Sequence, residues 1–186
     1  SKFYISSVAE SIRRYWQHNK KSNFLLFSFH GVPVRSLMEG DPYHCQCQKS
    51  ARLIAEELQL NNSNWAISFQ SRFGAAEWLK PYTTETIKML AEKGITTLDI
   101  VCPGFTSDCL ETLEEIAMEA KEDFINAGGK NFGYIPCLND GDLGIRMLKN
   151  IIVSELGVWG TESSNVEQEA CAKKQRERAL QLGAKI

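Results

Sequence analysis

The chain has 186 residues, of which 43% are hydrophobic and 24% are charged, and its formal net charge is −2. This composition predicts a globular domain with a full hydrophobic core, and the near-neutral charge excludes a general attraction to nucleic acid or to an anionic membrane surface. No apolar run approaches the ~20 residues that span a bilayer and no signal peptide is recognisable, so we expect a cytoplasmic protein.

Hydrophobic periodicity predicts the secondary structure in chain order. Helical spacing predicts helices over residues 3–18, 43–58, 83–93, 108–127 and 142–156. Short, mostly apolar runs predict strands over residues 23–29, 65–69, 96–102 and 132–136. We expect one domain over residues 1–160, followed over residues 161–186 by a charged helix or a partly ordered tail. Because the chain begins at Ser1 rather than Met, directly in a helical pattern, we interpret it as a piece of a longer protein.

The alternation of strands and helices predicts an α/β fold with a four-stranded parallel sheet flanked by helices on both faces. Ligands of such sheets bind at the carboxyl ends of the strands. His30, residues 70–78 and residues 105–111 all follow predicted strands, so we expect them to meet at one edge. The sequence has no glycine-rich nucleotide motif after the first strand and no G-x-S-x-G element, which argues against a nucleotide site or a serine hydrolase.

The predicted helix over residues 108–127 carries a row of carboxylates. Asp108 and Glu111 fit an N-cap with an acidic third residue, the pattern of a capping box. Glu111, Glu115 and Glu119 follow at steps of four, which places them on one face of a helix. Exposed like charges at this spacing repel by a few tenths of a kcal/mol. Taken alone, the stretch favours a capped, solvated helix, and the alternative is that a cation lies against the row.

Three separated segments resemble the ferrochelatase family, in the same order and at similar intervals. They are SFHGVP at Ser28 to Pro33, FQSRFG with EWLKPYT between Phe69 and Thr83, and CPGFTSDCLETLEEI from Cys102 to Ile116. The resemblance, which extends from about residue 5 to residue 155, implies an enzyme that inserts ferrous iron into protoporphyrin IX, the last step of haem biosynthesis. It also implies one of two Rossmann-like domains with the porphyrin between them. The chain resembles only the second, so the missing N-terminal domain is an expected partner.

The same resemblance implies roles for individual residues. It makes His30 and Glu111 the catalytic pair facing each other. It adds Asp108, Glu115 and Glu119 to these two as residues that handle the metal. Trp78 matches a tryptophan that lines the porphyrin pocket, and Phe105 an aromatic residue near the macrocycle.

The chemistry of metal insertion fits these residue types. Two pyrrole N–H protons must leave as Fe²⁺ enters, and imidazole is a base in the neutral range, so His30 is the natural acceptor. Whether His30 accepts the proton or binds the metal stays open. Glu111 can receive the second proton or deliver the metal through oxygen ligands. A flat apolar ring suits Val32, Phe73, Trp78 and Phe105, while Arg72 and Lys80 suit its propionates.

The sequence has six cysteines, which we expect to be reduced: Cys45, Cys47, Cys102, Cys109, Cys137 and Cys171. Some ferrochelatases hold a [2Fe–2S] cluster on four thiolates, and enough cysteines are present for one. However, Cys45 and Cys47 on one helix point about 200° apart, which is poor geometry for a single iron. Buried or surface thiols are therefore the favoured reading, unless the helix begins only after Cys47.

Two alternatives to a complete iron chelatase remain. One is a non-catalytic porphyrin-binding fragment, because half of a cleft should bind the ring weakly. The other is a cobalt chelatase acting on another tetrapyrrole, although such enzymes use more histidine, and only His30 lies near the predicted site while His18 and His44 lie elsewhere. No transmembrane segment is predicted, which leaves peripheral membrane contact open.

Overall fold

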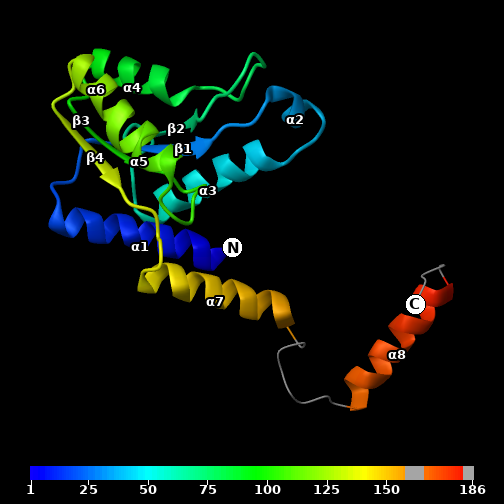
Figure 1. Cartoon of the computed structure of the whole chain (residues 1–186). Coiled ribbons are helices and arrows are strands. Elements are labelled where there is room, and N and C mark those ends of the chain that lie inside the picture. Colours follow the sequence, from blue (N-terminus) through cyan, green and yellow to red (C-terminus); the bar gives the residue numbers. More distant parts are fainter. Residues whose placement is uncertain (158–165, 182–186) are drawn as a thin grey trace. The chain divides into compact units, whose positions relative to one another are not determined.

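The computed structural model describes residues 1–157 and 166–181 (Figure 1). Its strands are β1 (Phe24–His30), β2 (Trp65–Gln70), β3 (Thr97–Val101) and β4 (Asn131–Ile135). They form one parallel sheet in the order β2-β1-β3-β4, with His30 opposite Gln70 and Val101 opposite Ile135. The predicted four-stranded parallel sheet is confirmed.

Helices cover both faces of this sheet. The main ones are α1 (Lys2–His18), α3 (Tyr43–Glu57), α4 (Thr83–Glu92) and α6 (Lys121–Asn126). Strand β1 explains why both faces need cover, because its side chains alternate between two separate cores. Leu25, Phe27 and Phe29 pack with α1 and α3, whereas Phe24 and Leu26 pack with α4 and α6. The continuous apolar run of β1 is thus the signature of a strand buried on both sides.

Three further helices belong to the described part of the chain. Helix α2 (Val34–Met38) was not predicted, because its five residues are too few to show a helical period. Helix α7 (Asp142–Leu156) confirms the predicted helix, and α8 (Val166–Gln181) lies in the charged terminal segment. The chain divides into compact units at residues 1–148 and 149–186. The predicted boundary between residues 160 and 161 lies outside the described residues.

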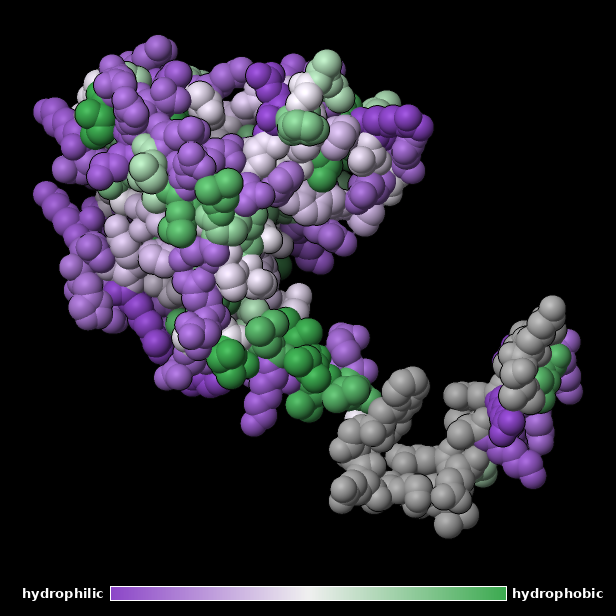
Figure 2. Space-filling model, in the orientation of Figure 1, coloured by the Kyte–Doolittle hydropathy of each residue, from purple (hydrophilic) through white to green (hydrophobic). Residues whose placement is uncertain are grey.

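Helix α7 is unusual in its surface. Figure 2 shows hydrophobic side chains gathered over it, and those that are large and exposed are Ile145, Leu148, Ile152, Val153 and Leu156. Their spacing follows one helical face. Even so, no helix in residues 1–157 or 166–181 is long and apolar enough to cross a membrane.

The predicted helix over residues 108–127 is wrong in its continuity and in its cap. The structure has α5 (Leu110–Leu113), a π-helical turn η1 (Glu115–Ala120) and then α6. In η1 the Glu119 amide donates to the Glu114 carbonyl at 2.9 Å, a bond that spans five residues. The N-cap is Cys109 rather than Asp108, and the Cys109 amide donates to Thr112 Oγ1 at 2.9 Å. Asp108 does not cap because its oxygens bind elsewhere.

Candidate active site

His30 is the last residue of β1 and is half-buried at the carboxyl end of the sheet. Its Nδ1 lies 2.6 Å from the carbonyl oxygen of Gly31. A carbonyl can only accept, so Nδ1 carries the proton in this contact and the lone pair of the neutral ring is on Nε2. The ring centroids of Trp78 and Phe105 both lie 6.1 Å from that of His30. A basic nitrogen is therefore placed among aromatic surfaces.

Two tyrosines hold the backbone around this histidine. The Tyr43 hydroxyl, from α3, donates to the His30 carbonyl at 2.8 Å. The Tyr4 hydroxyl, from α1, donates to the carbonyl of Pro103 at 2.7 Å, in the loop that leads to Phe105. Burial raises the pKa of both phenols far above the ordinary value, so both stay protonated donors at neutral pH. The loops that follow β1 and β3 are thus fixed from the helices beneath them.

An open pocket of about 660 Å³ lies at the same end of the sheet. Three structural segments contribute to its lining: the end of β1, the loop after β2, and the acidic wall, by which we mean α5 with η1. The lining residues are His30, Ser71, Arg72, Phe73, Trp78, Leu110, Glu111, Glu114, Glu115 and Glu119. Segments that are more than 30 residues apart in sequence therefore meet around one hollow, as the carboxyl-end rule predicts.

Glu111 is the carboxylate of the acidic wall that is electrostatically closest to the histidine. Its interaction with the Cys109 thiol, with its own amide and, to a smaller extent, with His30 lowers the pKa of Glu111. The side chain is therefore ionised near neutral pH. The backbone of Glu111 is held as well, because Gln70 Nε2 donates to its carbonyl at 2.6 Å.

Gln70 connects the two sides of the pocket through the sheet. Its side chain is 3% exposed, and its Oε1 accepts a hydrogen bond from Ser28 of β1 at 2.7 Å. Since its amide also reaches Glu111, one buried side chain joins β1, β2 and α5. A buried amide with both ends satisfied fixes geometry, and the loss of either partner leaves an uncompensated polar group.

Asp108 points away from the pocket and into a hydrogen-bonded cluster after β4. Its carboxylate accepts from the Cys137 amide at 3.1 Å, from Asn139 Nδ2 at 2.8 Å and from the Tyr134 hydroxyl. Burial alone would raise the pKa of Asp108, but these hydrogen bonds together outweigh it and lower that pKa below the ordinary value. The predicted metal residue Asp108 is thus not brought to the pocket lining.

The loop after β2 brings some predicted porphyrin contacts to the pocket and not others. Phe73, Trp78 and Arg72 line it, and Phe73 is 81% exposed at its rim. Lys80 does not, because its Nζ pairs with Glu77 at 2.9 Å on the outer side of the loop. That pair raises the pKa of Lys80 and lowers the pKa of Glu77. Val32 also lies off the lining, and its carbonyl accepts from the Leu79 amide at 2.9 Å.

With this geometry in view, comparison with known proteins identifies the family. The model of the family described as Ferrochelatase matches residues 1–156. The chain belongs to the ferrochelatase family. Curated ferrochelatases from Janthinobacterium sp. (strain Marseille) and Polaromonas sp. are each 52% identical to it over 97% of its residues. The ferrochelatase from Nitrosococcus oceani is 50% identical over 98% of the chain. The chain spans only about half the length of these relatives.

The ferrochelatase family binds iron as a substrate, but the predicted metal residues do not form one coordination centre. Within residues 1–157 and 166–181, no three His, Cys, Asp or Glu side chains are grouped so as to hold a metal ion. His30, Glu111, Glu115 and Glu119 share the pocket lining, whereas Asp108 does not. Of the three histidines only His30 lines the pocket, and His44 instead stacks on Phe69 with centroids 5.8 Å apart.

No three of the cysteines with described side chains are grouped so as to hold a metal ion. Helix α3 begins at Tyr43, so Cys45 and Cys47 are both helical, and Cys45 is exposed whereas Cys47 is buried. Burial is the main cause that raises the pKa of Cys47 to about 11 and that of Cys137 to about 12, so both thiols are protonated near neutral pH in the metal-free chain. All five cysteines with described side chains are free thiols, and the side chain of Cys171 lies outside the described part.

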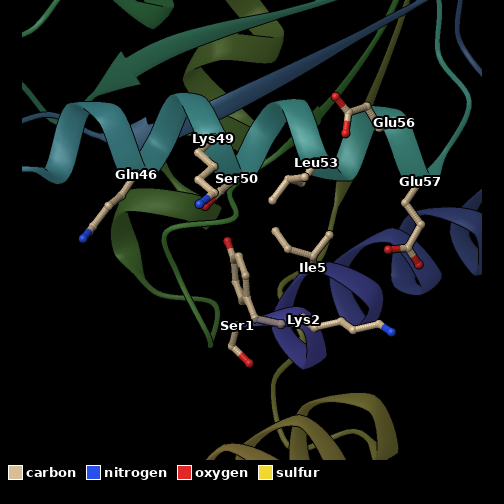
Figure 3. Close-up of a pocket in the computed structure, with 10 residues that line it drawn as sticks. Ser1, Lys2, Ile5, Gln46, Lys49, Ser50, Leu53, Glu56 and Glu57 are labelled. Carbon is tan, nitrogen blue, oxygen red and sulfur yellow. The ribbon is translucent and has the colours of Figure 1, made fainter.

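A second groove lies away from the site, between α1 and α3 (Figure 3). Its volume of about 870 Å³ exceeds that of the pocket at the strand ends. Ile5 and Leu53 face each other across it, and Lys2, Lys49 and Glu57 are among its polar residues. None of the predicted catalytic or porphyrin residues lines this groove, so size alone does not mark the site.

Sequence reasoning missed several residues that shape the pocket. Gln70, Ser71 and Leu110 lie in the segments that were expected at the strand ends but were given no role, and Glu114 was not predicted at all; Ser71, Leu110 and Glu114 line the pocket. A role for Gln70 and Ser71 could have been found, because Gln70 ends β2 opposite His30 and Ser71 follows it. Glu114 could not have been predicted as a pocket residue, because it lies at a π turn that the sequence pattern does not indicate.

Proposed function

We propose that the chain is the catalytic half of a ferrochelatase that inserts Fe²⁺ into protoporphyrin IX to make protohaem. The observation that carries the proposal is the shared pocket of His30 and Glu111, with the rings of Trp78 and Phe105 next to the histidine. Membership of the ferrochelatase family supports the same reaction. The relatives are bacterial, which supports a cytoplasmic location.

The release of two protons gives His30 and Glu111 distinct roles in the proposed reaction. Insertion releases two pyrrole protons for each Fe²⁺ that enters the ring. His30 takes one on Nε2, since its Nδ1 proton is engaged with Gly31. Glu111 is ionised, because its pKa is lowered, and it takes the second proton or holds the incoming cation. Two acceptors in one pocket therefore match a reaction that releases two protons.

The ring itself is bound by the aromatic side chains. Trp78 and Phe105 are placed against a macrocycle that lies over His30, and Phe73 extends this apolar surface at the rim. Val32 lies off the pocket lining, so we assign it no contact with the ring. Arg72 lines the pocket and can meet a propionate. Lys80 would first have to leave Glu77, so we assign it the weaker propionate contact.

The remainder of the enzyme is the proposed partner. The chain spans half the length of its relatives, and the pocket is open with Phe73 and Leu110 exposed at its rim. A second wall supplied by the other domain would enclose the porphyrin between two surfaces. Without that wall, the chain alone is expected to bind porphyrin weakly and without turnover, and this porphyrin-binding fragment is the second candidate function.

The test is to complete the enzyme by joining this chain to the other half of the Janthinobacterium ferrochelatase, which is 52% identical over the shared part. Zinc insertion into protoporphyrin, followed by fluorescence, should appear in the completed enzyme and vanish in His30→Ala. The chain alone should change the absorbance of porphyrin without inserting zinc. A folded, completed enzyme without insertion would refute the proposed activity.

A further inference from the structure

Ser71 adopts a strained backbone at the edge of the pocket. It follows β2 directly and has φ of +60°, in the left-handed region that residues other than glycine rarely adopt. Such a conformation costs on the order of 1 kcal/mol and persists only where the surroundings impose it. Ser71 also begins the loop that carries Arg72, Phe73 and Trp78 to the pocket. The conformation of Ser71 therefore sets the direction in which that loop leaves the sheet.

The carboxylate of Glu115 imposes this conformation. Oε1 of Glu115 accepts from the Ser71 amide at 2.6 Å, and Oε2 accepts from the Ser71 hydroxyl at 2.7 Å. Gln70 Nε2 lies 3.4 Å from the same Oε2. Both carboxylate oxygens are thus engaged by one residue of the loop, in short bonds to a charged acceptor, which are the stronger kind.

Glu115 belongs to the opposite wall of the pocket. It is the first residue of η1, one turn after Glu111, whose carbonyl is bound by Gln70. Two consecutive residues of the β2 edge, Gln70 and Ser71, therefore bind two successive turns of the acidic wall. We call these contacts of Glu115 with Ser71 the Glu115 clamp.

We propose that Glu115 is a positioning residue, which fixes the loop carrying Trp78 against the acidic wall and does not carry the metal. This inference rests on the proposed function and assigns metal handling among the pocket carboxylates to Glu111 and Glu119. A metal ion bound by Glu115 would compete with the amide and hydroxyl of Ser71 for the same two oxygens and would weaken the bonds that hold the strained turn. The clamp would then loosen each time iron entered.

Paired substitutions separate positioning from metal binding. In Glu115→Gln the amide oxygen can still accept from the Ser71 amide while its NH₂ donates to Ser71 Oγ, so the clamp is kept and the charge is lost. Glu115→Ala removes both. Glu119→Gln is the matched control, because it removes a charge from the same pocket lining without touching Ser71.

The readouts are amide exchange over residues 70–82 and separate saturation curves for zinc and porphyrin in the completed enzyme. Glu115→Ala should speed exchange at Ser71 and raise the KM for porphyrin by about tenfold, with the KM for zinc within about twofold. Glu115→Gln should restore both exchange and porphyrin KM. Glu119→Gln should raise the KM for zinc and leave exchange unchanged.

A second route to the same conclusion avoids the risk that Glu115→Ala fails to fold. Ser71→Gly accepts φ of +60° and loses only the hydroxyl bond, whereas Ser71→Ala loses that bond and keeps the strain. Ser71→Ala should therefore loosen the loop more than Ser71→Gly. The inference is overturned if Glu115→Gln raises the KM for zinc as much as Glu115→Ala does, or if neither alters exchange. Exchange is read without turnover, so a failure of the clamp is distinguishable from a failure of the proposed activity.

Discussion

The acidic residues between 108 and 119 fall into two groups that look alike in sequence and differ in structure. Asp108 and Glu115 have their carboxylates engaged by donors, from the segment after β4 and from the β2 edge respectively. Glu115 shares the pocket lining with Glu111, Glu114 and Glu119, and among these four Glu111 is the one whose pKa is lowered in part by His30. Hydrogen-bond donors that are distant in sequence thus determine which carboxylates can interact with a cation or a proton.

The two groups of carboxylates have different roles, one structural and one chemical. A carboxylate that accepts several hydrogen bonds shapes the backbone around it, and the cost of burying it is offset by those bonds. A carboxylate facing a hollow keeps its charge available to a cation or a proton. Substitutions in the first group should therefore act on stability and loop order, and those in the second on chemistry.

The largest expected effect is on chemistry. In the completed enzyme, His30→Ala should lower the rate of zinc insertion by about 10²–10⁴-fold, because it removes the general base. Thermal unfolding should change little, since the ring is only half-buried and contributes no bond to the core. Fluorescence of the zinc porphyrin measures the rate, and near-normal insertion by a folded His30→Ala protein would exclude a proton-accepting role.

The next largest effect is expected for Gln70, whose side chain joins β1, β2 and α5. Gln70→Ala should lower the free energy of unfolding by about 2–3 kcal/mol, because the Glu111 carbonyl loses its side-chain donor and Ser28 keeps only Thr83 as a side-chain partner. Urea unfolding measures this. Gln48→Ala, at an exposed position of α3, is the control and should stay within about 0.5 kcal/mol of the parent. Equal effects of the two would contradict the role given to Gln70.

Asp108→Asn should cost about 1–2 kcal/mol near neutral pH, since an amide NH₂ would face donors that now meet a carboxylate. The pKa of Asp108 is lowered by folding, so its contribution is complete above the ordinary aspartate value of about 4 and is lost as pH falls through the folded-state pKa. Unfolding measured against pH should therefore show parent and variant converging below about pH 4. A constant gap down to pH 2 would contradict this.

The smallest effect tests the support under the histidine. Tyr43→Phe should cost about 1 kcal/mol, because it removes the hydrogen bond to the His30 carbonyl while keeping the ring packed. The NMR chemical shifts of the His30 ring should also move, because the strand end that carries the ring loses a hydrogen bond. Tyr82→Phe, whose hydroxyl makes only a 3.3 Å contact with Trp78, is the control and should change neither quantity.

The fold was largely predictable because it follows from periodicity. An uninterrupted apolar run predicted strand β1, and the spacing of apolar residues predicted the amphipathic helices that cover it. Helix α2 was too short to show a period. The π turn after Glu114 was missed because it depends on the Glu119 amide reaching a carbonyl five residues back, which the helical spacing of the sequence does not indicate.

The site was predictable to the extent that it depends on strand ends. His30, Glu111, Trp78 and Phe105 meet because parallel strands deliver their carboxyl ends to one edge. The directions of side chains within loops were not predictable. Asp108 turns toward Tyr134 and Asn139, which lie 26 and 31 residues away, and Lys80 turns toward Glu77. Such contacts depend on tertiary neighbours that no local pattern encodes.

The two tyrosines beneath the strand ends connect the proposed active site to distant regions of the chain. Tyr4 stands in the first turn of α1 and Tyr43 in the first turn of α3, yet each fixes a loop carbonyl beside the reacting ring. A truncation or tag that disturbs the first turn of α1 is therefore expected to lower the proposed activity even when every residue of the pocket is unchanged. Helices α1 and α3 should therefore be kept intact in any redesign of this chain.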